Sequence, residues 1–292
     1  MSTTGEHSLV RAPAARPADG SADGPGRDES PGQLASFRTL GPLDVRTSDG
    51  ERVFIAQRKK RRLLALLLLH GGGWVGTEQI AVALWEDDPP RSALGNIKTY
   101  VSDLRHALPP LAQPSGPGRI VGREGEYSLR LCPGERDVEL FDADAVAGEE
   151  ALLAGRPADA APLLDRALGR WRGRPYEDLP ADVAVAETTR LEELRWVVWE
   201  NLVDARLRLG QQDRVLPALR ALTLKHPTRE RLWAQLLVAL DQDGRRAEAL
   251  GAYREVYRTL TENLGIEPGD RLRSEHQRIL SGRRSQRPVV GP

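Results

Sequence analysis

Two neighbouring stretches of the chain carry residue types whose spacing suits contact with a polyanion. Residues 58–62 place five cations in a row, directly before a leucine-rich segment. If this run opens a helix, each exposed cation opposes the helix macrodipole at a cost of about 0.3–1 kcal/mol. A sequence that breaks a local rule in this way usually gains something elsewhere. Lys59 and Arg61 are therefore candidates for phosphate contact, and the alternative is a solvated basic cap.

The second stretch begins after Ser92. Apolar residues recur there at spacings of three and four and predict a helix with one buried face: Leu94, Ile97, Val101, Leu104 and Leu108. The stripe leaves five polar positions outward, with the cations Lys98 and Arg105 flanking them: Asn96, Thr99, Ser102, Asp103 and His106. Short polar groups can read base edges in a major groove, and flanking cations can contact phosphates. Any exposed helix shows such a face, so DNA readout and simple solvation both remain open.

A predicted hairpin and an acidic loop flank these stretches. Extended runs at residues 119–121 and 127–131 predict the hairpin, from which Arg123 would reach a minor groove or a phosphate. Arg119 lies on the same hairpin, whereas Tyr127 is better explained as its anchor in the core. Between the second and third helices lie three consecutive carboxylates followed by two prolines: Glu86, Asp87 and Asp88. Acids there gain nothing from DNA, so they either meet a basic protein surface or form a solvated turn.

The elements that position these residues follow a recognisable order. Strands are expected at residues 37–46 and 52–56, and helices at residues 59–70, from 77 to 85, and from Ser92 to the prolines at 109 and 110. With the closing hairpin they make the winged form of helix-turn-helix. From residue 138 to 280 the pattern is helical in consecutive pairs, which suggests a tetratricopeptide-like array.

The fold class that follows is mainly α, with an N-terminal winged helix-turn-helix of α+β type before an all-α helical array. The expected domains are residues 37–131 and 138–280. Residues 1–36 are rich in Pro, Ala, Gly and Ser and predict a disordered extension, and residues 281–292 predict a flexible tail. Four tryptophans of the helical region fit core packing better than a ligand platform: Trp171, Trp196, Trp199 and Trp233.

Composition limits the function classes. The net charge is zero, but residues 37–131 carry 14 basic and 10 acidic side chains and residues 132–280 carry 22 and 27, so the cations gather in the first domain. A single cysteine, Cys132, excludes an internal disulfide and fits a reducing compartment. Without an expected signal segment or membrane span, a cytoplasmic location is predicted.

Catalysis is not expected. The glycine run at residues 71–73 lacks the Lys-Ser/Thr of a phosphate-binding loop. The five histidines show no metal-ligand spacing, and no carboxylate pair suggests an acid and a base. No cofactor or metal is therefore predicted, and two hypotheses remain: a DNA-binding activator, or an interaction scaffold in which the array binds a partner and the winged helix is a docking module.

Several strings in order resemble the Streptomyces antibiotic regulatory protein (SARP) family. In the first domain they are residues 40–45, 63–69, 83–90 and 100–108. In the second they are residues 171–173, 191–195, 226–232 and 264–268, which resemble the bacterial transcriptional activation domain that accompanies it. The resemblance covers about residues 37–280. Two positions depart from the family pattern and place negative charge near expected phosphates: Asp103, where Arg is frequent, and Glu126, where glycine precedes the wing tyrosine.

The resemblance implies a transcriptional activator of secondary-metabolite gene clusters. Such proteins bind direct repeats in double-stranded promoter DNA, which implies a dimer on the DNA, and they recruit RNA polymerase. For the acidic loop at residues 86–88 the resemblance suggests the σ factor or a neighbouring polymerase subunit as partner.

Overall fold

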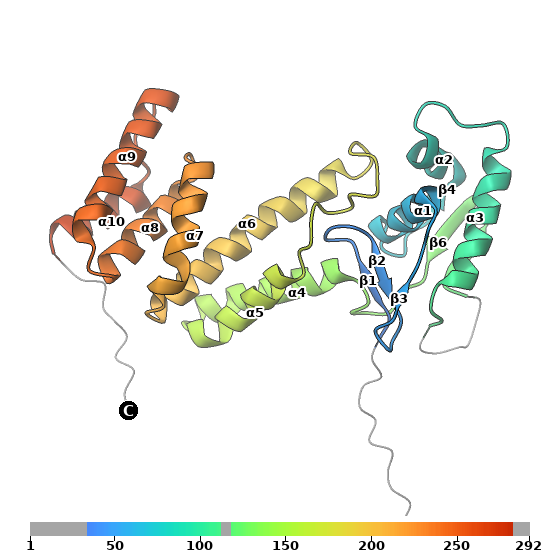
Figure 1. The fold of residues 1–292 in the computed structure, drawn as a ribbon, viewed down its shortest axis with the longest axis horizontal. Helices are drawn as coiled ribbons and strands as arrows, with labels where there is room; N and C mark the ends of the chain where they lie inside the picture. The colour runs from blue at the N-terminus through green and yellow to red at the C-terminus, as the bar shows by residue number, and fades with distance from the viewer. Residues whose placement is uncertain (1–33, 112–117, 283–292) are drawn as a thin grey trace, which may run out of the picture. The chain divides into compact units, whose positions relative to one another are not determined.

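The computed structural model describes residues 34–111 and 118–282. The expected disordered extension and flexible tail therefore lie almost entirely outside the described residues, as does most of the loop expected at residues 113–118. The described chain opens with three strands, continues through three helices and a hairpin, and ends in seven further helices (Figure 1). This order confirms the predicted fold class of a winged helix-turn-helix followed by a helical array.

The first sheet pairs β1 (Ser36–Arg38), β2 (Asp44–Arg46) and β3 (Arg52–Val53) antiparallel in chain order, with Phe37 opposite Val45. The prediction of one strand across residues 37–46 is wrong, because the chain folds back between β1 and β2.

Carboxylates far along the chain hold that turn. The backbone N–H groups of Thr39 and Leu40 donate to the Asp137 carboxylate at 2.8 and 3.0 Å, and Leu43 N donates to Asp178 at 2.8 Å. Gly41 has a φ of +137°, which L side chains rarely adopt. The turn is therefore satisfied by tertiary partners that no local pattern reveals.

The helix-turn-helix comprises α1 (Arg58–Leu69), α2 (Thr77–Trp85) and α3 (Ala93–Ala107), which all pack against one another. A second sheet has the order β4-β6-β5, in which β5 (Ile120–Arg123) and β6 (Glu126–Leu129) form the predicted hairpin. The sequence missed β4 (Val75–Gly76), a two-residue strand that pairs with β6 and is too short to show alternation.

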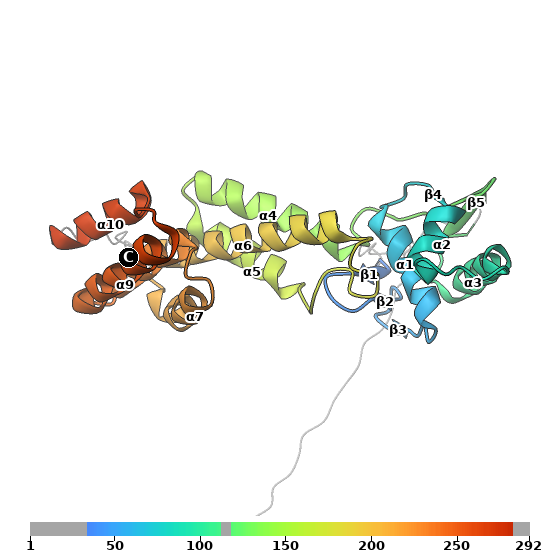
Figure 2. The same cartoon turned by 90° about the horizontal axis from the view of Figure 1, so that it is seen from above.

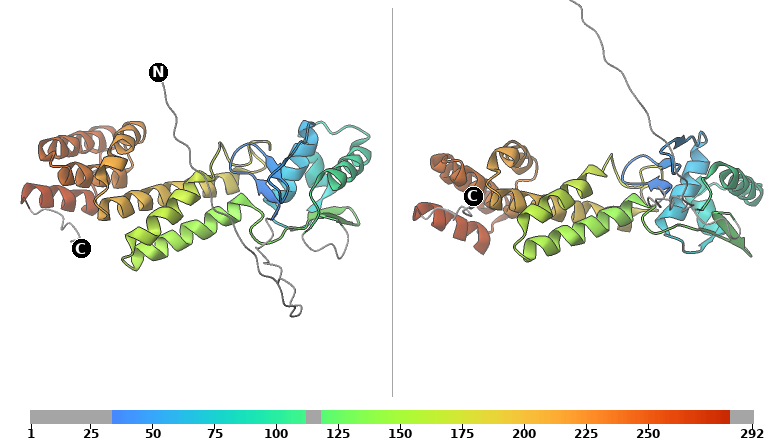
Figure 3. Two further views of the ribbon diagram at one scale, coloured as in Figure 1. Left: turned by 60° about the horizontal axis from the view of Figure 1, so that its bottom comes forward. Right: turned by 90° about the horizontal axis from the view of Figure 1, so that it is seen from below.

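Among the described residues the second region contains helices and no strand, as the sequence predicts. Its helices are α4 (Asp137–Leu153), α5 (Pro157–Gly169), α6 (Val185–Arg208), α7 (Gln212–Lys225), α8 (Glu230–Gln242), α9 (Arg246–Leu264) and α10 (Asp270–Leu280). Neighbouring helices pack side by side, α4 with α5 and α6 (Figures 2 and 3), and α8 with α7 and α9 (Figure 1). None of the helices in the described ranges has both the length and the apolar character that a bilayer crossing requires.

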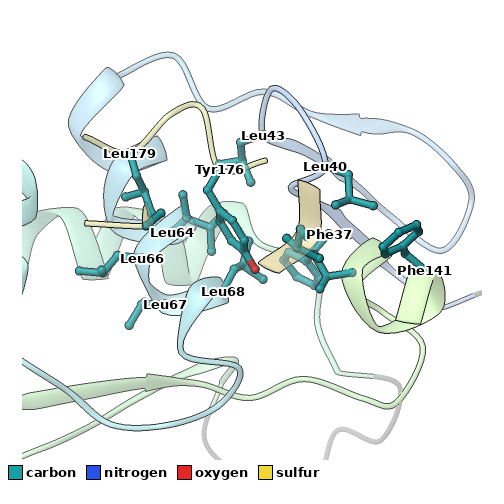
Figure 4. Packing of buried hydrophobic residues seen from close by; sticks show 14 of the residues in the cluster. Phe37, Leu40, Leu43, Leu64, Leu66, Leu67, Leu68, Phe141, Tyr176 and Leu179 are labelled. Carbon is teal, nitrogen blue, oxygen red and sulfur yellow. The ribbon is translucent and has the colours of Figure 1, made fainter. Parts of the chain in front are cut away.

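The buried core does not divide where the sequence suggested. One apolar cluster runs from Ala35 through α1 and on to Ala205 in α6, and a second begins at Val203 and ends at Ile279. In the first cluster Phe37 and Leu64 lie with Phe141 and Tyr176, so strand, helix and array share one core (Figure 4). The expected boundary between residues 131 and 138 is thus a change of secondary structure and leaves the apolar packing unbroken.

Candidate nucleic-acid interface

Helix α3 has the two faces that its sequence predicts. Ile97, Val101 and Leu104 are buried, and Lys98, Thr99, Ser102, Arg105 and His106 are exposed. Leu94 departs from the prediction, because its side chain is 61% exposed in the first turn, next to the exposed α2–α3 loop. The outward face therefore combines short polar groups with two cations.

Local hydrogen bonds orient several of these polar groups. The Thr99 hydroxyl donates to Gly95 O at 3.1 Å, and His106 Nδ1 donates to the Ser102 carbonyl at 2.7 Å. A hydroxyl that donates once keeps its acceptor lone pairs, and an imidazole keeps its second nitrogen. Asn96 is half-buried, and its amide donates to Ser92 Oγ at 3.2 Å, so its amide nitrogen is engaged at the start of the helix.

The five-residue basic run separates around α1 into different environments. Lys59 Nζ lies 4.6 Å from the ring centre of Trp85, and Lys60 forms an ion pair with Asp103 at 2.7 Å. Arg62 is buried. Successive side chains point about 100° apart around a helix with 3.6 residues per turn, so a contiguous run cannot present one surface.

Arg61, a predicted phosphate contact, is held by the helical array. Its Nε donates to Asp178 Oδ1 at 2.8 Å, and the other oxygen of the same carboxylate accepts from Leu43 N. The side chain is part-exposed, at 39%. Lys59 is therefore better placed than Arg61 for a phosphate contact.

The two unexpected carboxylates are both neutralised within the domain. Asp103 pairs with Lys60 and ties α3 to the start of α1. Glu126 accepts a hydrogen bond from Arg123 Nε, and the Arg123 guanidinium also lies 4.2 Å from the ring centre of Trp74. Cation–π contact and ion pairing together hold Arg123 on the hairpin, where its side chain remains 56% exposed.

Arg119 does not belong to an exposed wing. Its side chain is 2% exposed and makes a two-point ion pair with Glu135, at 2.7 and 2.8 Å. Arg105 joins α3 to the hairpin, because its Nε donates to Ile120 O at 2.8 Å. Tyr127 packs against the core, as predicted.

The acidic loop between α2 and α3 is exposed throughout. Glu86 has a φ of +59° and lies 3.4 Å from Arg62 Nη1. Within the described residues Asp87 and Asp88 form no ion pair. Arg58, which opens the basic run, and Arg91, which the sequence analysis did not single out, are exposed cations at the starts of α1 and α3. Neither has an ion-pair partner in the described ranges. A proline pair directly before Arg91 was the available signal.

No cluster of three or more His, Cys, Asp or Glu side chains among residues 34–111 and 118–282 has the geometry to hold a metal ion.

Comparison with known proteins places the chain in a family. Residues 136–280 match the family described as the bacterial transcriptional activator domain. The chain is similar to the regulatory protein DnrI of Streptomyces peucetius, with 37% identity over 82% of this chain and 90% of DnrI. It is also similar to the transcriptional regulatory protein EmbR of Mycobacterium tuberculosis, with 38% identity over 84% of this chain and 63% of EmbR.

The chain is also similar to a longer regulatory protein and to a solved structure. The regulatory protein AfsR of Streptomyces coelicolor is 37% identical over 88% of this chain, which spans only 25% of AfsR. The solved structure of Mycobacterium tuberculosis EmbR in complex with a low affinity phosphopeptide matches with a TM-score of 0.74 and 35% identity, over 86% of this chain and 66% of that one. The chain therefore belongs to the SARP family of transcriptional regulators, with a winged helix-turn-helix and a bacterial transcriptional activator domain.

Proposed function

We propose that the chain is a sequence-specific DNA-binding transcriptional activator in which α3 reads the major groove. The observation that carries the proposal is the outward face of α3, where Thr99, Ser102 and His106 lie opposite the buried stripe. Such short polar groups fit base edges, and Lys98 on the same exposed side fits a phosphate.

Phosphate contacts are assigned to side chains around that face. The proposed phosphate contacts are Lys59 at α1, Lys98 and Arg105 on α3, and Arg123 on the hairpin. Asn96 is instead a proposed base contact, because its side-chain oxygen can accept a hydrogen bond from a base amino group. Each phosphate neutralised contributes about 0.9 to the slope of log affinity against log salt. Arg61 contributes only if its bond to Asp178 opens.

The test separates base readout from backbone contact. Thr99→Ala and Ser102→Ala should each weaken cognate promoter DNA by roughly 1–3 kcal/mol if a full base contact is lost, and should barely change random DNA. Lys59→Ala should weaken both DNAs alike and flatten the salt slope. Thr228→Ala, an exposed threonine on the helical array, is the matched control and should change neither. Equal weakening of both DNAs by the α3 variants would refute base readout.

We further propose that the acidic loop contacts RNA polymerase, at the σ factor or a neighbouring subunit. Asp87 and Asp88 support this, because they are exposed carboxylates that form no ion pair with any cation in the described part of the chain. Glu86 contributes less, since Arg62 already lies against it.

The polymerase contact is tested by removing charge without changing size. Asp87→Asn with Asp88→Asn should leave promoter binding near normal in a gel shift and reduce transcript in a reconstituted reaction. Asp182→Asn with Asp213→Asn removes two exposed charges from the array and should leave both unchanged. Full transcription from the loop variant would exclude the contact.

From the family we propose that the DNA targets are promoters of a secondary-metabolite gene cluster. We also propose that the protein acts in the cytoplasm. Two copies on direct repeats would give two protected half-sites of the same orientation in a footprint. The scaffold alternative is weakened, because Asp103 and Glu126, which favoured it, are each paired with a cation inside the winged-helix domain.

A further inference from the structure

A pocket of about 360 Å³ lies between α6 and α7, away from the surfaces assigned to DNA and polymerase. From α6 it is lined by Glu192, Arg195, Trp196 and Trp199, which recur at the three- and four-residue spacing of one helix face. The facing side chains of α7 and its C-terminus include Lys225 and His226.

The two tryptophans pack against the second apolar cluster, as the sequence predicts, but they are not enclosed by it. Trp233 on α8 is 2% exposed, whereas Trp196 and Trp199 are only half-buried and open onto the pocket. Trp196 is fixed in place, with Arg229 4.4 Å from its ring centre and His226 edge-on at 4.5 Å. Among the described residues Trp199 has no ring or cation contact, so it is the indole available for stacking.

Neither cation of the pocket forms an ion pair among the described residues. Elsewhere on α6, Arg190 and Arg206 each pair with a carboxylate, at 2.8 Å to Glu187 and 2.6 Å to Asp165. Within the described ranges Arg195 forms no ion pair and lies instead 4.5 Å from the ring centre of Trp171. Lys225 has no ion-pair partner there either.

The surroundings of the pocket carry a net positive field. Burial lowers the pKa of the Arg195 guanidinium, because removing water disfavours its charged form, and the charge of Glu192 acts in the opposite direction. Burial also lowers the pKa of His226, and the charges of Lys225 and Arg229 lower it further. Glu192 is the one carboxylate among the described lining side chains, and it cannot balance both cations.

From this juxtaposition we propose that the α6–α7 pocket binds a small planar aromatic anion. Its ring stacks on Trp199, and its carboxylate or phenolate lies between Arg195 and Lys225. The volume falls within the roughly 300–1,000 Å³ of small-molecule sites, and apolar walls with a few placed charges are their usual lining. A peptide would require an extended groove, whereas this pocket holds a single ring system.

The test uses 2-naphthoate as probe, titrated into the full chain by calorimetry. We expect saturable one-to-one binding. The neutral analogue 2-naphthylmethanol should bind about tenfold more weakly, because it lacks the charge that strengthens the hydrogen bonds to the two cations. No saturable binding of the naphthoate, or equal binding of the neutral analogue, would overturn the proposal.

Variants locate the binding. Arg195→Gln with Lys225→Gln should weaken 2-naphthoate about tenfold and leave 2-naphthylmethanol unchanged. Arg214→Gln with Arg258→Gln, which removes two exposed cations elsewhere on the array, is the matched control and should change neither probe.

Trp199→Leu should weaken the binding of both probes. If the leucine variant unfolds, Trp199→Phe replaces it in the test and should keep much of the affinity, because it retains an aromatic ring. Naphthoate affinity unchanged by the double glutamine variant would overturn the assignment. Because the readout is a small-molecule isotherm, its failure leaves the DNA-binding proposal untouched.

Discussion

Replacement of Arg119 by methionine tests the buried ion pair that fixes the hairpin. The guanidinium donates to both oxygens of Glu135 and to Pro110 O at 3.0 Å. The side chains of Arg119 and Glu135 are both almost wholly inaccessible to solvent. Methionine keeps the length of the side chain and removes every one of these donors. Glu135 is then left with the backbone N–H of Cys132, at 2.8 Å, as its remaining hydrogen-bond donor.

The expected cost is large. Breaking a buried pair by removing one partner costs about 3–5 kcal/mol, because the other charge stays in the low-dielectric interior. That is a sizeable share of the roughly 5–15 kcal/mol by which domains are stable. In urea, with a slope of about 3 kcal/mol/M, the unfolding midpoint should fall by about 1–1.7 M.

Two further variants make the measurement specific. Arg119→Met combined with Glu135→Leu should recover most of the loss, since an apolar replacement of a whole buried pair is often neutral or stabilising. Arg123→Met breaks the exposed pair with Glu126 on the same hairpin and should cost less than about 1 kcal/mol. The reasoning is refuted if Arg119→Met costs as little as Arg123→Met, or if adding Glu135→Leu deepens the loss.

Two predictions concern the helical array. Burial by itself raises the pKa of Asp144, but hydrogen bonds and charges from Arg166 and the C-cap arginine of α5 outweigh it and hold the pKa below its ordinary 3.8. The stability that the ionised carboxylate contributes is therefore present at neutral pH and lost as the pH falls below 3.8 through the folded-state pKa. In thermal melts, Asp144→Asn should lose less stability than the parent protein in this acid range. An unchanged loss of stability in acid would contradict the prediction. A Cβ on Gly148 would lie 2.5 Å from Leu164 Cδ2, so Gly148→Ala should lower the free energy of unfolding by about 1–3 kcal/mol. Gly251→Ala, where a Cβ meets open space, is the control and should not destabilise the protein. Equal melting temperatures for the two variants would count against tight α4–α5 packing.

The sequence by itself determined the features that depend on near neighbours. The helical character of residues 138–280 follows from apolar spacing, and the structure confirms it. The buried stripe of α3 and its polar face follow from the same periodicity, with Leu94 as the exception at the exposed helix start. A helix repeats every 3.6 residues, so a short window of sequence contains the information.

Tertiary structure decided which charged groups are available. Arg119 and Arg123 stand four residues apart on one hairpin, yet the first is buried on Glu135 and the second is exposed. Arg61 meets Asp178, 117 residues away along the chain. The energy of a charge depends on its burial and on its partner, and both are set by the packed fold.

Packing between distant segments also explains the environment of two tryptophans and the end of the first strand. Trp196 and Trp199 pack against the core, as their helical spacing predicts, but α7 leaves a pocket that both also line. The turn after β1 exists because the Asp137 carboxylate, 97 residues beyond Leu40, accepts its backbone N–H groups. The local sequence pattern determines the helices of this protein. Contacts between distant segments determine the turn after β1 and which side chains remain available to bind a partner.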